Sequence, residues 1–440
     1  MIVFMTNTQR MKTILFILSS LALSINLYPQ RALSDKQWIE DLEFITHRLD
    51  SIHPNPYINI SKEHFQIEID NLKSKIPTYT DDEIISQFLH IITLVRDGHT
   101  RLHGNKLTSK WYPLRIEKFS DGFYITAITK EHSKFIGARI LAFNNQPVEN
   151  VFQQLKGITP HDNSYSQDYF VPMYLTMSSI LSGLHIKESS DDLLTVSVRI
   201  KGQKDEKLVL NSTEFQAGDD LSWFWRDYAV PANEFVNILS VDSILPLYLK
   251  KYKQPFWYDF IKENNTVYFA FNECVNDENN NFESFNNKLW SYIDSLKAKY
   301  LIIDLRNNFG GTNSYIMPLV HEIIKHDGIN KKGNLFLITS KKTFSAALDC
   351  ATWIEFHCNP IFVGEPTGAA PNHYADPDFS YLPNSKILLM ISKYYWQDSW
   401  PWDNRMCIEP TIKVDLSSVD YFNYKDPAID EIFKYLKQNQ

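Results

Sequence analysis

The 440-residue sequence lacks any run of more than two consecutive lysines or arginines, any internal repeat and any low-complexity segment. Its net charge of −8 at pH 7 argues against nucleic acid as the main partner, because phosphate backbones are held by clustered cations. Its hydrophobic content of 44% is ample for a sizeable core, so the chain is not expected to be disordered. The length is typical of roughly two to four domains.

The chain also lacks, near its N-terminus, an apolar run of the length that usually spans a membrane. The apolar run at residues 14–23 follows Arg10 and Lys12, and it has the length of the apolar part of a secretory leader. We therefore expect residues 1–28 to be a signal peptide, with Met11 as an alternative start and an uncleaved anchor as the alternative interpretation. The mature protein is expected to be exported, periplasmic or extracellular, and to meet the membrane only transiently.

Only four cysteines are present. Cys350 and Cys358 fall on one predicted helix about 12 Å apart, whereas a disulfide needs Cα atoms within about 7 Å. Any disulfide must therefore involve Cys274 or Cys407. The acidic residue and the histidine between Cys350 and Cys358 complete no recognised ligand spacing, so we expect no metal site in this group.

The region after the leader is predicted to be helical. Ser34 and Gln37 form a capping box ahead of apolar residues spaced three and four apart, and Thr80 and Glu83 form another. A further helix lies between these two. The last helix is expected to end at Gly98, acting as a C′ glycine.

Further along the chain, the pattern changes twice. Residues 110–212 show short β-like runs between turn residues, and the run 136–148 reads as a strand, an Asn-Asn turn and a helix start. Residues 213–255 are aromatic and irregular. From Phe256 onward strands and helices alternate, which predicts an α/β layer with crossover helices. The predicted strands are 266–273, 300–305, 334–339, 360–364 and 386–394, and the predicted helices are 281–298, 313–326, 345–357 and 427–437.

Ser345 is a candidate nucleophile within the alternating region. It follows a predicted strand and opens an apolar helix, so it lies beside free backbone amides and the positive end of the helix dipole. That position would stabilise an attacking hydroxyl and the oxyanion it creates. Serine is also a favoured helix cap, so position alone does not establish a nucleophile.

Four segments together resemble the family of serine peptidases that contains the carboxyl-terminal (tail-specific) processing proteases and the tricorn protease core. The resemblance covers nearly everything from about residue 35 to the C-terminus. The segments are the Asp-Gly-His-Thr loop at 97–100, the Asp-Leu-Arg-x-Asn-x-Gly-Gly signature at 304–311, the Thr-Phe-Ser-Ala-Ala segment at 343–347 and the strand and turn at 363–368.

The resemblance implies an α/β fold (α+β overall), with a crotonase-like catalytic domain, an N-terminal helical segment and an inserted PDZ-like β domain. It leaves open whether the PDZ-like domain captures a peptide C-terminus by strand addition or serves as a structural lid. The implied division is signal peptide 1–28, N-terminal helical segment 29–108, PDZ-like domain 109–212, irregular connection 213–255 and crotonase-like catalytic domain 256–440.

The family has two catalytic solutions, and the sequence distinguishes them. Tail-specific proteases use a Ser-Lys dyad with the lysine 25 residues after the serine, a position occupied here by Ala370. Alanine cannot accept a proton, and Lys341 and Lys342 are expected to be solvated surface residues. The chain is therefore similar to the tricorn-like branch, in which a histidine from the early helical segment, here His99, is the base.

The resemblance implies that Ser345 attacks a peptide carbonyl while His99 takes its proton and later protonates the leaving amine. Asp403, shortly before a Pro-containing strand, is the implied acid that orients the imidazole. Asp398 and Glu409 are alternatives for the acid.

The oxyanion is expected to be held by backbone amides of Gly310 or Gly311 and of Ala346. His373 is an alternative base. No metal or organic cofactor is implied. The aromatic residues between 394 and 402 are interpreted as core, with a substrate cleft as the alternative.

The predicted function is an exported serine peptidase that acts on peptides or unfolded proteins by a Ser-His-acid mechanism. The alternative is a non-catalytic ligand- or peptide-binding protein on the same fold. The retinoid-binding proteins of the eye resemble this family and act as carriers. A carrier has no reason to keep serine, histidine and acid together, which favours the peptidase.

Overall fold

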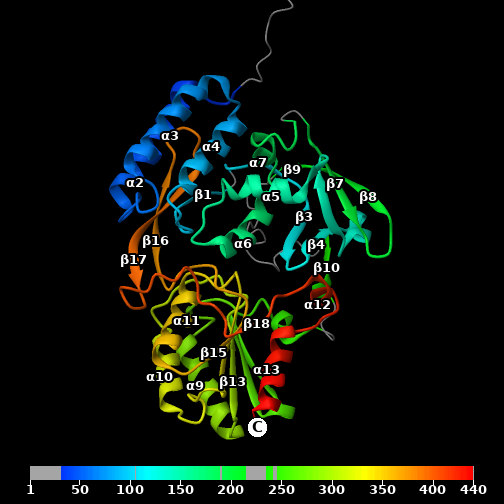
Figure 1. Cartoon of the computed structure of the whole chain (residues 1–440), viewed down its shortest axis with the longest axis vertical. Coiled ribbons are helices and arrows are strands. Elements are labelled where there is room, and N and C mark those ends of the chain that lie inside the picture. The colour runs from blue at the N-terminus through cyan, green and yellow to red at the C-terminus, as the bar shows by residue number, and fades with distance from the viewer. Residues whose placement is uncertain (1–30, 105, 189–190, 215–233, 241–244, 440) are drawn as a thin grey trace, which may run out of the picture.

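The computed structural model describes residues 31–439 except 105, 189–190, 215–233 and 241–244. The predicted signal peptide and part of the irregular connection lie outside the described residues. Figure 1 shows a molecule of two halves, with the N-terminal helices and an antiparallel sheet in one half and a parallel sheet with its helices in the other. Within the described residues, no helix combines the length and the apolar character needed to cross a membrane.

Three helices form the start of the described chain, as predicted. Both capping boxes are present. The Ser34 and Thr80 side chains accept from the backbone amide of the third helical residue, and the side chain of that residue accepts from the backbone amide of Ser34 or Thr80. Their apolar faces enter the same core as the antiparallel sheet. The helices are α2 (Asp35–Ile52), α3 (Lys62–Lys75) and α4 (Asp81–Thr93).

The predicted end of the last helix at Gly98 is wrong. Helix α4 ends at Thr93, and Arg96 adopts a left-handed φ of 55° that redirects the chain. Gly98 is instead required by packing. A Cβ at Gly98 would lie 2.6 Å from Oδ2 of Asp162 and 2.9 Å from Cζ of Phe344, closer than a Cβ approaches other heavy atoms. The loop after α4 therefore packs directly against Phe344 at Gly98.

The strands predicted in the middle region form one seven-stranded sheet. Asn144 and Asn145 both have positive φ, as a tight Asn-Asn hairpin turn requires. Helices α6 (Ser164–Tyr174) and α7 (Ser178–Gly183) were not predicted. The strand order is β10 (Phe235–Asn237), β4 (Gly122–Thr129), β5 (Arg139–Phe143), β7 (Leu193–Arg199) and β8 (Asp205–Asn211). In addition, β3 (Leu114–Phe119) pairs with β4, and β6 (Gln146–Pro147) pairs with β5. Helix α5 (Val148–Lys156) follows β6 in the chain.

The second half is built on a six-stranded sheet in which all neighbours are parallel except the first pair. The helices that connect these strands confirm the predicted alternation. The strand order is β11 (Phe256–Ile261), β12 (Thr266–Phe271), β13 (Tyr300–Asp304), β14 (Leu335–Thr339), β15 (Ile361–Gly364) and β18 (Ile412–Lys413). The helices are α9 (Phe282–Leu296), α10 (Met317–Lys325), α11 (Ala346–His357) and α13 (Pro427–Gln438).

The parallel sheet is buried on both faces, which explains the continuous apolar runs of its strands. In β13, Leu301 and Ile303 face the core made with α9, α10 and α11, whereas Tyr300 and Ile302 face the core made with α13. Figure 1 shows these helices on opposite sides of the sheet. The carboxyl ends of β13 and β14 point toward the other half of the molecule, so the loops that follow them lie at the junction.

One predicted strand belongs to a different sheet. The segment expected at 386–394 forms β17 (Leu388–Gln397), which pairs antiparallel with β16 (Asn372–Tyr381) and with β1 (Arg101–His103). Because β1 directly follows the loop that holds His99, this three-stranded sheet joins the N-terminal segment to the second half. Long-range pairing of this kind is not visible in local sequence patterns.

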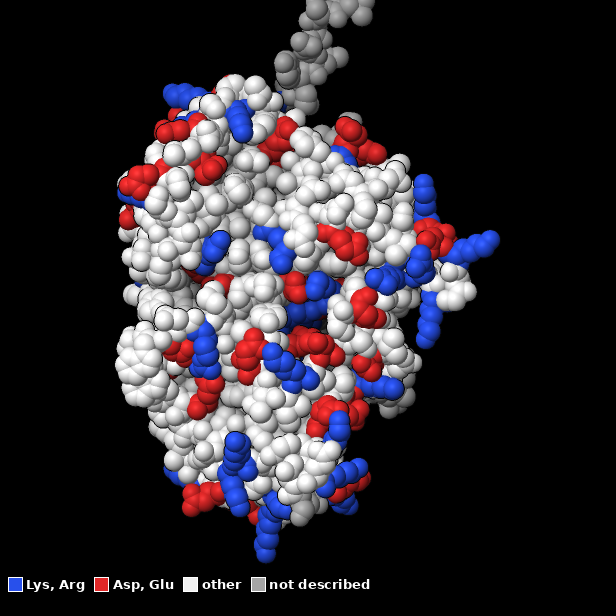
Figure 2. Space-filling view, in the orientation of Figure 1, with Lys and Arg blue, Asp and Glu red and all other residues white. Residues whose placement is uncertain are grey.

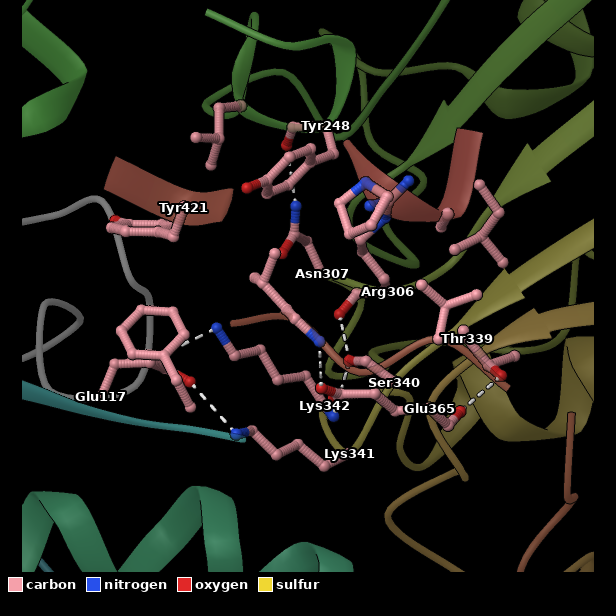
Figure 3. A pocket seen from close by; sticks show the side chains of 18 of the residues that line it. Glu117, Tyr248, Arg306, Asn307, Thr339, Ser340, Lys341, Lys342, Glu365 and Tyr421 are labelled. Atoms are coloured by element: carbon pink, nitrogen blue, oxygen red, sulfur yellow. Dashed lines mark hydrogen bonds and ion pairs between the residues drawn. The ribbon is translucent and has the colours of Figure 1, made fainter. Parts of the chain in front are cut away.

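Lys341 and Lys342 are not the solvated surface residues that the sequence suggested. Their side chains are 12% and 15% exposed, and both ammonium groups lie near the Glu117 carboxylate, at 3.6 and 3.4 Å. Figure 3 shows this group in a cavity between the two halves. Figure 2 shows acidic and basic side chains gathered at the junction between the two halves and interspersed elsewhere on that face. The two lysines therefore form ion pairs between the two halves.

The aromatic residues before Asp403 are also not core. Tyr394, Tyr395, Trp400 and Trp402 are each about half exposed or more, with Trp402 at 70%. Trp400 stacks on Trp402 with ring centroids 5.0 Å apart. All four cysteines are free thiols in the structure.

Candidate active site

Ser345 occupies the N-cap position of α11 but does not cap it. Its side chain makes no capping hydrogen bond. Its backbone adopts φ 51° and ψ −135°, a conformation that costs a non-glycine residue about 1–3 kcal/mol. Such strain persists where the surrounding structure imposes it, and it concentrates at functional sites. The hydroxyl is thus left available at the positive end of a helix.

The turn opposite Ser345 is fixed by the buried side chain of Asn308. Its amide donates to the Phe271 carbonyl at 2.9 Å, and its Oδ1 accepts from the Gly310 amide at 2.9 Å. The Phe344 amide donates to the Asn308 carbonyl at 3.3 Å. These bonds hold the Gly310-Gly311 turn against the segment that carries Ser345.

Gly310 must be glycine to let the two segments meet. Its φ is 107°, and a Cβ there would lie 2.6 Å from the Ser345 Cβ and 3.0 Å from the Ala346 nitrogen. The space beside Ser345 and the first amide of α11 is therefore open only because this residue has no side chain. Among the described residues, the amides of Gly311 and Ala346 donate to no acceptor, whereas that of Gly310 is used by Asn308.

We predict that Gly310→Ala lowers peptidase activity by about 10²-fold, because a donor displaced from an oxyanion site typically costs about 10²–10³ in rate. The positive φ and the close approach to Ser345 both oppose the added methyl group. Cleavage rates of the wild type and the variant would be compared on denatured casein. Gly328→Ala, where a Cβ meets nothing within 4 Å, is the matched control. Equal activity of Gly310→Ala and Gly328→Ala would contradict this role for the turn.

The His99 side chain packs against the residue that precedes the candidate nucleophile. Its ring stacks on Phe344 with centroids 4.5 Å apart. Burial lowers the pKa of His99 to about 3, against the opposing charge of Asp97, so the imidazole is neutral in the folded protein at pH 7. Neither ring nitrogen has a hydrogen-bond partner among the described residues. Ser345 and His99 therefore share no hydrogen bond in this structure.

Asp97, which sequence reasoning did not select as the acid, lies next to His99, and its charge opposes the lowering of the His99 pKa. Its Oδ1 accepts from the His99 amide at 2.9 Å, and its Oδ2 accepts from Thr100 and lies 3.2 Å from Nε2 of His53. Burial alone would raise the pKa of Asp97, but the His53 hydrogen bond and the nearby imidazoles bring it to about 2. The carboxylate is therefore ionised beside His99. Its place in the Asp-Gly-His-Thr loop was the signal available in the sequence.

Asp403, the acid implied by the sequence, is not brought to His99. Its carboxylate accepts from Ser399 at 2.7 Å and from Arg405 at 2.8 and 3.0 Å. These hydrogen bonds, led by Arg405, lower the pKa of Asp403 to about 2. Arg405 in turn pairs with Glu355 on α11. The Asp403 carboxylate is thus paired with Arg405, two residues further along the chain, and not with the His99 imidazole.

Glu409 and Asp398, which the sequence also allowed as the acid, lie in different surroundings. Glu409 pairs with Lys413 at 2.7 Å on the surface. Asp398 lies near His373, and burial raises the pKa of Asp398 to about 7. The His373 ring is 5.8 Å from that of His99, so this second candidate base shares the neighbourhood of the site.

Asp162 is a second buried acid beside the His99 loop. Its Oδ1 accepts from the Gly98 amide at 3.1 Å, while its Oδ2 is buried without a hydrogen-bond partner among the described residues. Burial, with the charge of Asp97, raises the pKa of Asp162 to about 8. The carboxyl group is therefore protonated in the folded protein at neutral pH.

This shift predicts a pH-dependent effect of Asp162→Asn. The unfolded carboxyl loses its proton near its ordinary pKa and the folded one only near 8, so the wild type loses stability progressively across that window. Asparagine does not titrate, so the variant should gain melting temperature relative to wild type as the pH rises from about 4 to about 8. A difference in melting temperature that is constant with pH would contradict the buried, protonated state of Asp162.

The fold matches that of mature CPAF complexed with lactacystin. The TM-score is 0.63 at 15% identity, and the match covers 92% of this chain and 98% of the other. A crystal structure of a serine-to-alanine mutant of CPAF gives a TM-score of 0.64 at 14% identity, covering 92% and 97%. At this identity the likeness shows a shared fold of mixed helices and sheets. No family model matches the sequence, and no curated protein matches it.

Structures with weaker similarity include the photosystem II D1 C-terminal processing protease, at a TM-score of 0.38, and the tricorn protease, at 0.41.

Proposed function

We propose that this protein is a serine peptidase that hydrolyses peptide bonds of peptides or unfolded proteins. The observation that carries the proposal is Ser345 itself. It is held in a strained conformation at a helix N-terminus, its hydroxyl is not used as a cap, and two free amides lie beside it. A serine that served only to start the helix would have neither the strain nor the unused hydroxyl.

The proposed mechanism uses His99 as the base and Ser345 as the nucleophile. In this mechanism the imidazole takes the hydroxyl proton as the Ser345 oxygen attacks the peptide carbonyl. The amides of Gly311 and Ala346 stabilise the oxyanion. Asp97 stabilises the imidazolium, which then protonates the leaving amine, and water releases the acyl group by the reverse sequence.

We also propose a class of substrate and a location for the protein. The resemblance of the four sequence segments to those of the processing proteases favours a peptide or an unfolded protein as substrate. The apolar run after Arg10 and Lys12 favours export to the periplasm or the extracellular space. The same resemblance favours a catalytic domain of crotonase type and a PDZ-like character for the seven-stranded sheet.

The test is digestion of denatured casein by the purified mature protein, with and without prior treatment by a fluorophosphonate. We expect digestion in the untreated sample and none after treatment, because a fluorophosphonate esterifies an activated serine. Digestion unaffected by the fluorophosphonate would contradict a serine mechanism. A folded protein that digests nothing and reacts with no probe would support the binding protein instead.

A further inference from the structure

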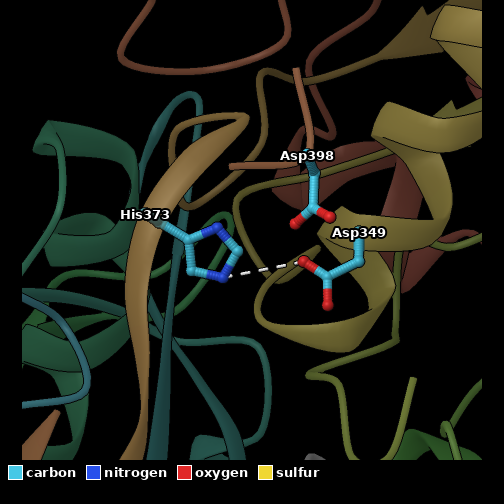
Figure 4. A group of neighbouring side chains, drawn as sticks. All are labelled: Asp349, His373 and Asp398. Carbon is cyan, nitrogen blue, oxygen red and sulfur yellow. Dashed lines mark ion pairs between the residues drawn. The ribbon is translucent and has the colours of Figure 1, made fainter. Parts of the chain in front are cut away.

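Three titratable side chains form a buried group beside the candidate active site. Asp349 comes from α11, His373 from β16 and Asp398 from the segment after β17. One potential ligand atom from each lies within 4.8 Å of the others. Asp349 and His373 are each only 4% exposed. Figure 4 shows the two carboxyl groups directed toward the imidazole.

Each carboxylate is held through one oxygen and leaves the other unused. Oδ2 of Asp349 accepts from the Asn313 amide, and Oδ1 of Asp398 accepts from the Trp353 indole, both at 2.8 Å. The remaining oxygens, Oδ1 of Asp349 and Oδ2 of Asp398, receive no hydrogen bond from a donor group in the part of the chain that the structure describes, and the two carboxyl groups lie next to each other. Oδ1 of Asp349 lies 3.7 Å from Nε2 of His373.

The neutral donors orient the two acids without balancing their charge. Within the described ranges, no lysine or arginine pairs with either carboxylate. Two neighbouring carboxylates at a largely buried site require a cation or a proton between them. Fixing one oxygen of each acid by a hydrogen bond while the other faces a common point is the arrangement seen around metal ligands.

We propose that Asp349, His373 and Asp398 bind a divalent transition-metal ion, for which Zn²⁺ is the probe. One imidazole nitrogen and two carboxylate oxygens suit Zn²⁺, whereas Mg²⁺ prefers oxygen ligands alone. A water molecule would complete the coordination.

The ion would connect the two parts of the candidate active site. Helix α11 begins directly after Ser345, and the Asp349 amide donates to the Ser345 carbonyl at 3.1 Å. Strands β16 and β17 belong to the sheet whose β1 follows the His99 loop, and the Ser392 amide donates to Thr100 at 3.1 Å. A shared ion would therefore fix the sheet beside His99 to the helix that starts at Ser345.

The experiment measures Zn²⁺ binding to EDTA-treated mature protein by calorimetry and by thermal melting. We expect one Zn²⁺ per chain and a melting temperature that rises with Zn²⁺ concentration, since the ion binds the folded state. The Asp349→Asn, Asp398→Asn double variant keeps the acceptor oxygens for Asn313 and Trp353, so it should remain folded. It should bind Zn²⁺ at least about 100-fold more weakly, because ligand charge dominates metal affinity.

His357→Gln is the matched control, because this exposed histidine lies on the same helix beside Cys358. It should bind Zn²⁺ as the wild type does. Absence of Zn²⁺ binding by the folded wild type would overturn the proposal in favour of a shared proton. Binding retained by the double variant, or lost in His357→Gln, would also overturn it. None of these readouts depends on peptidase activity, so failure of the metal site and failure of the proposed function can be distinguished.

Discussion

Ser345→Ala is expected to reduce the rate of casein cleavage by about 10⁴-fold or more and to leave the fold intact, because the variant removes the nucleophile while the amides beside it remain. The structure predicts no loss of stability, since the hydroxyl caps nothing. Alanine meets the same backbone strain as serine at φ 51°. The measurement is the initial cleavage rate together with the melting temperature.

A helix-capping serine elsewhere gives the matched control. The Ser61 side chain accepts from the His64 amide at the start of α3. Ser61→Ala should therefore lower the free energy of unfolding by about 1 kcal/mol and leave activity unchanged. The two substitutions thus have opposite expected effects. A Ser345→Ala variant that is destabilised but still cleaves casein would assign Ser345 an ordinary capping role.

His99→Gln is expected to reduce the cleavage rate by about 10²–10⁴-fold, the usual contribution of a general base. Glutamine approximates the volume of histidine, so the packing on Phe344 and the buried position are largely kept. The amide cannot accept the serine proton and later return it. The rate would be measured at saturating substrate, so that a change in substrate affinity does not obscure the loss.

The control for His99 is His64→Gln, an exposed histidine on α3. Its activity should equal that of the wild type. The informative competitor is His373, which lies 5.8 Å from His99 between ring centroids. An active His99→Gln variant together with an inactive His373→Gln variant would move the base to His373 and contradict the assignment.

Local sequence signals were sufficient for most of the secondary structure. Both predicted capping boxes are formed, because they depend on residues three positions apart. The alternation of strands and helices after Phe256 also emerged from apolar patterning. The C-terminal end of α4 was misplaced because the role of Gly98 is set by Asp162 and Phe344, which approach it from distant parts of the chain.

The candidate nucleophile was visible in the sequence, but its electrostatic surroundings were not. Ser345 was indicated by its position between a strand and a helix. Asp403 was selected as the acid from its position along the chain, yet its carboxylate accepts a hydrogen bond from Arg405, two residues away. Asp97 was passed over although it lies in the same loop as His99. Side-chain orientation of this kind depends on burial and on partners that sequence spacing does not specify.

The most direct test of Ser345 as the nucleophile is peptide mapping of the fluorophosphonate adduct by mass spectrometry. The wild-type protein would be labelled in the folded state, digested and searched for the modified residue. We predict a single adduct on Ser345, because this hydroxyl lies at the N-terminus of α11 beside the amides of Gly311 and Ala346. An adduct on another serine, or none on the folded protein, would contradict the assignment of Ser345 as the nucleophile.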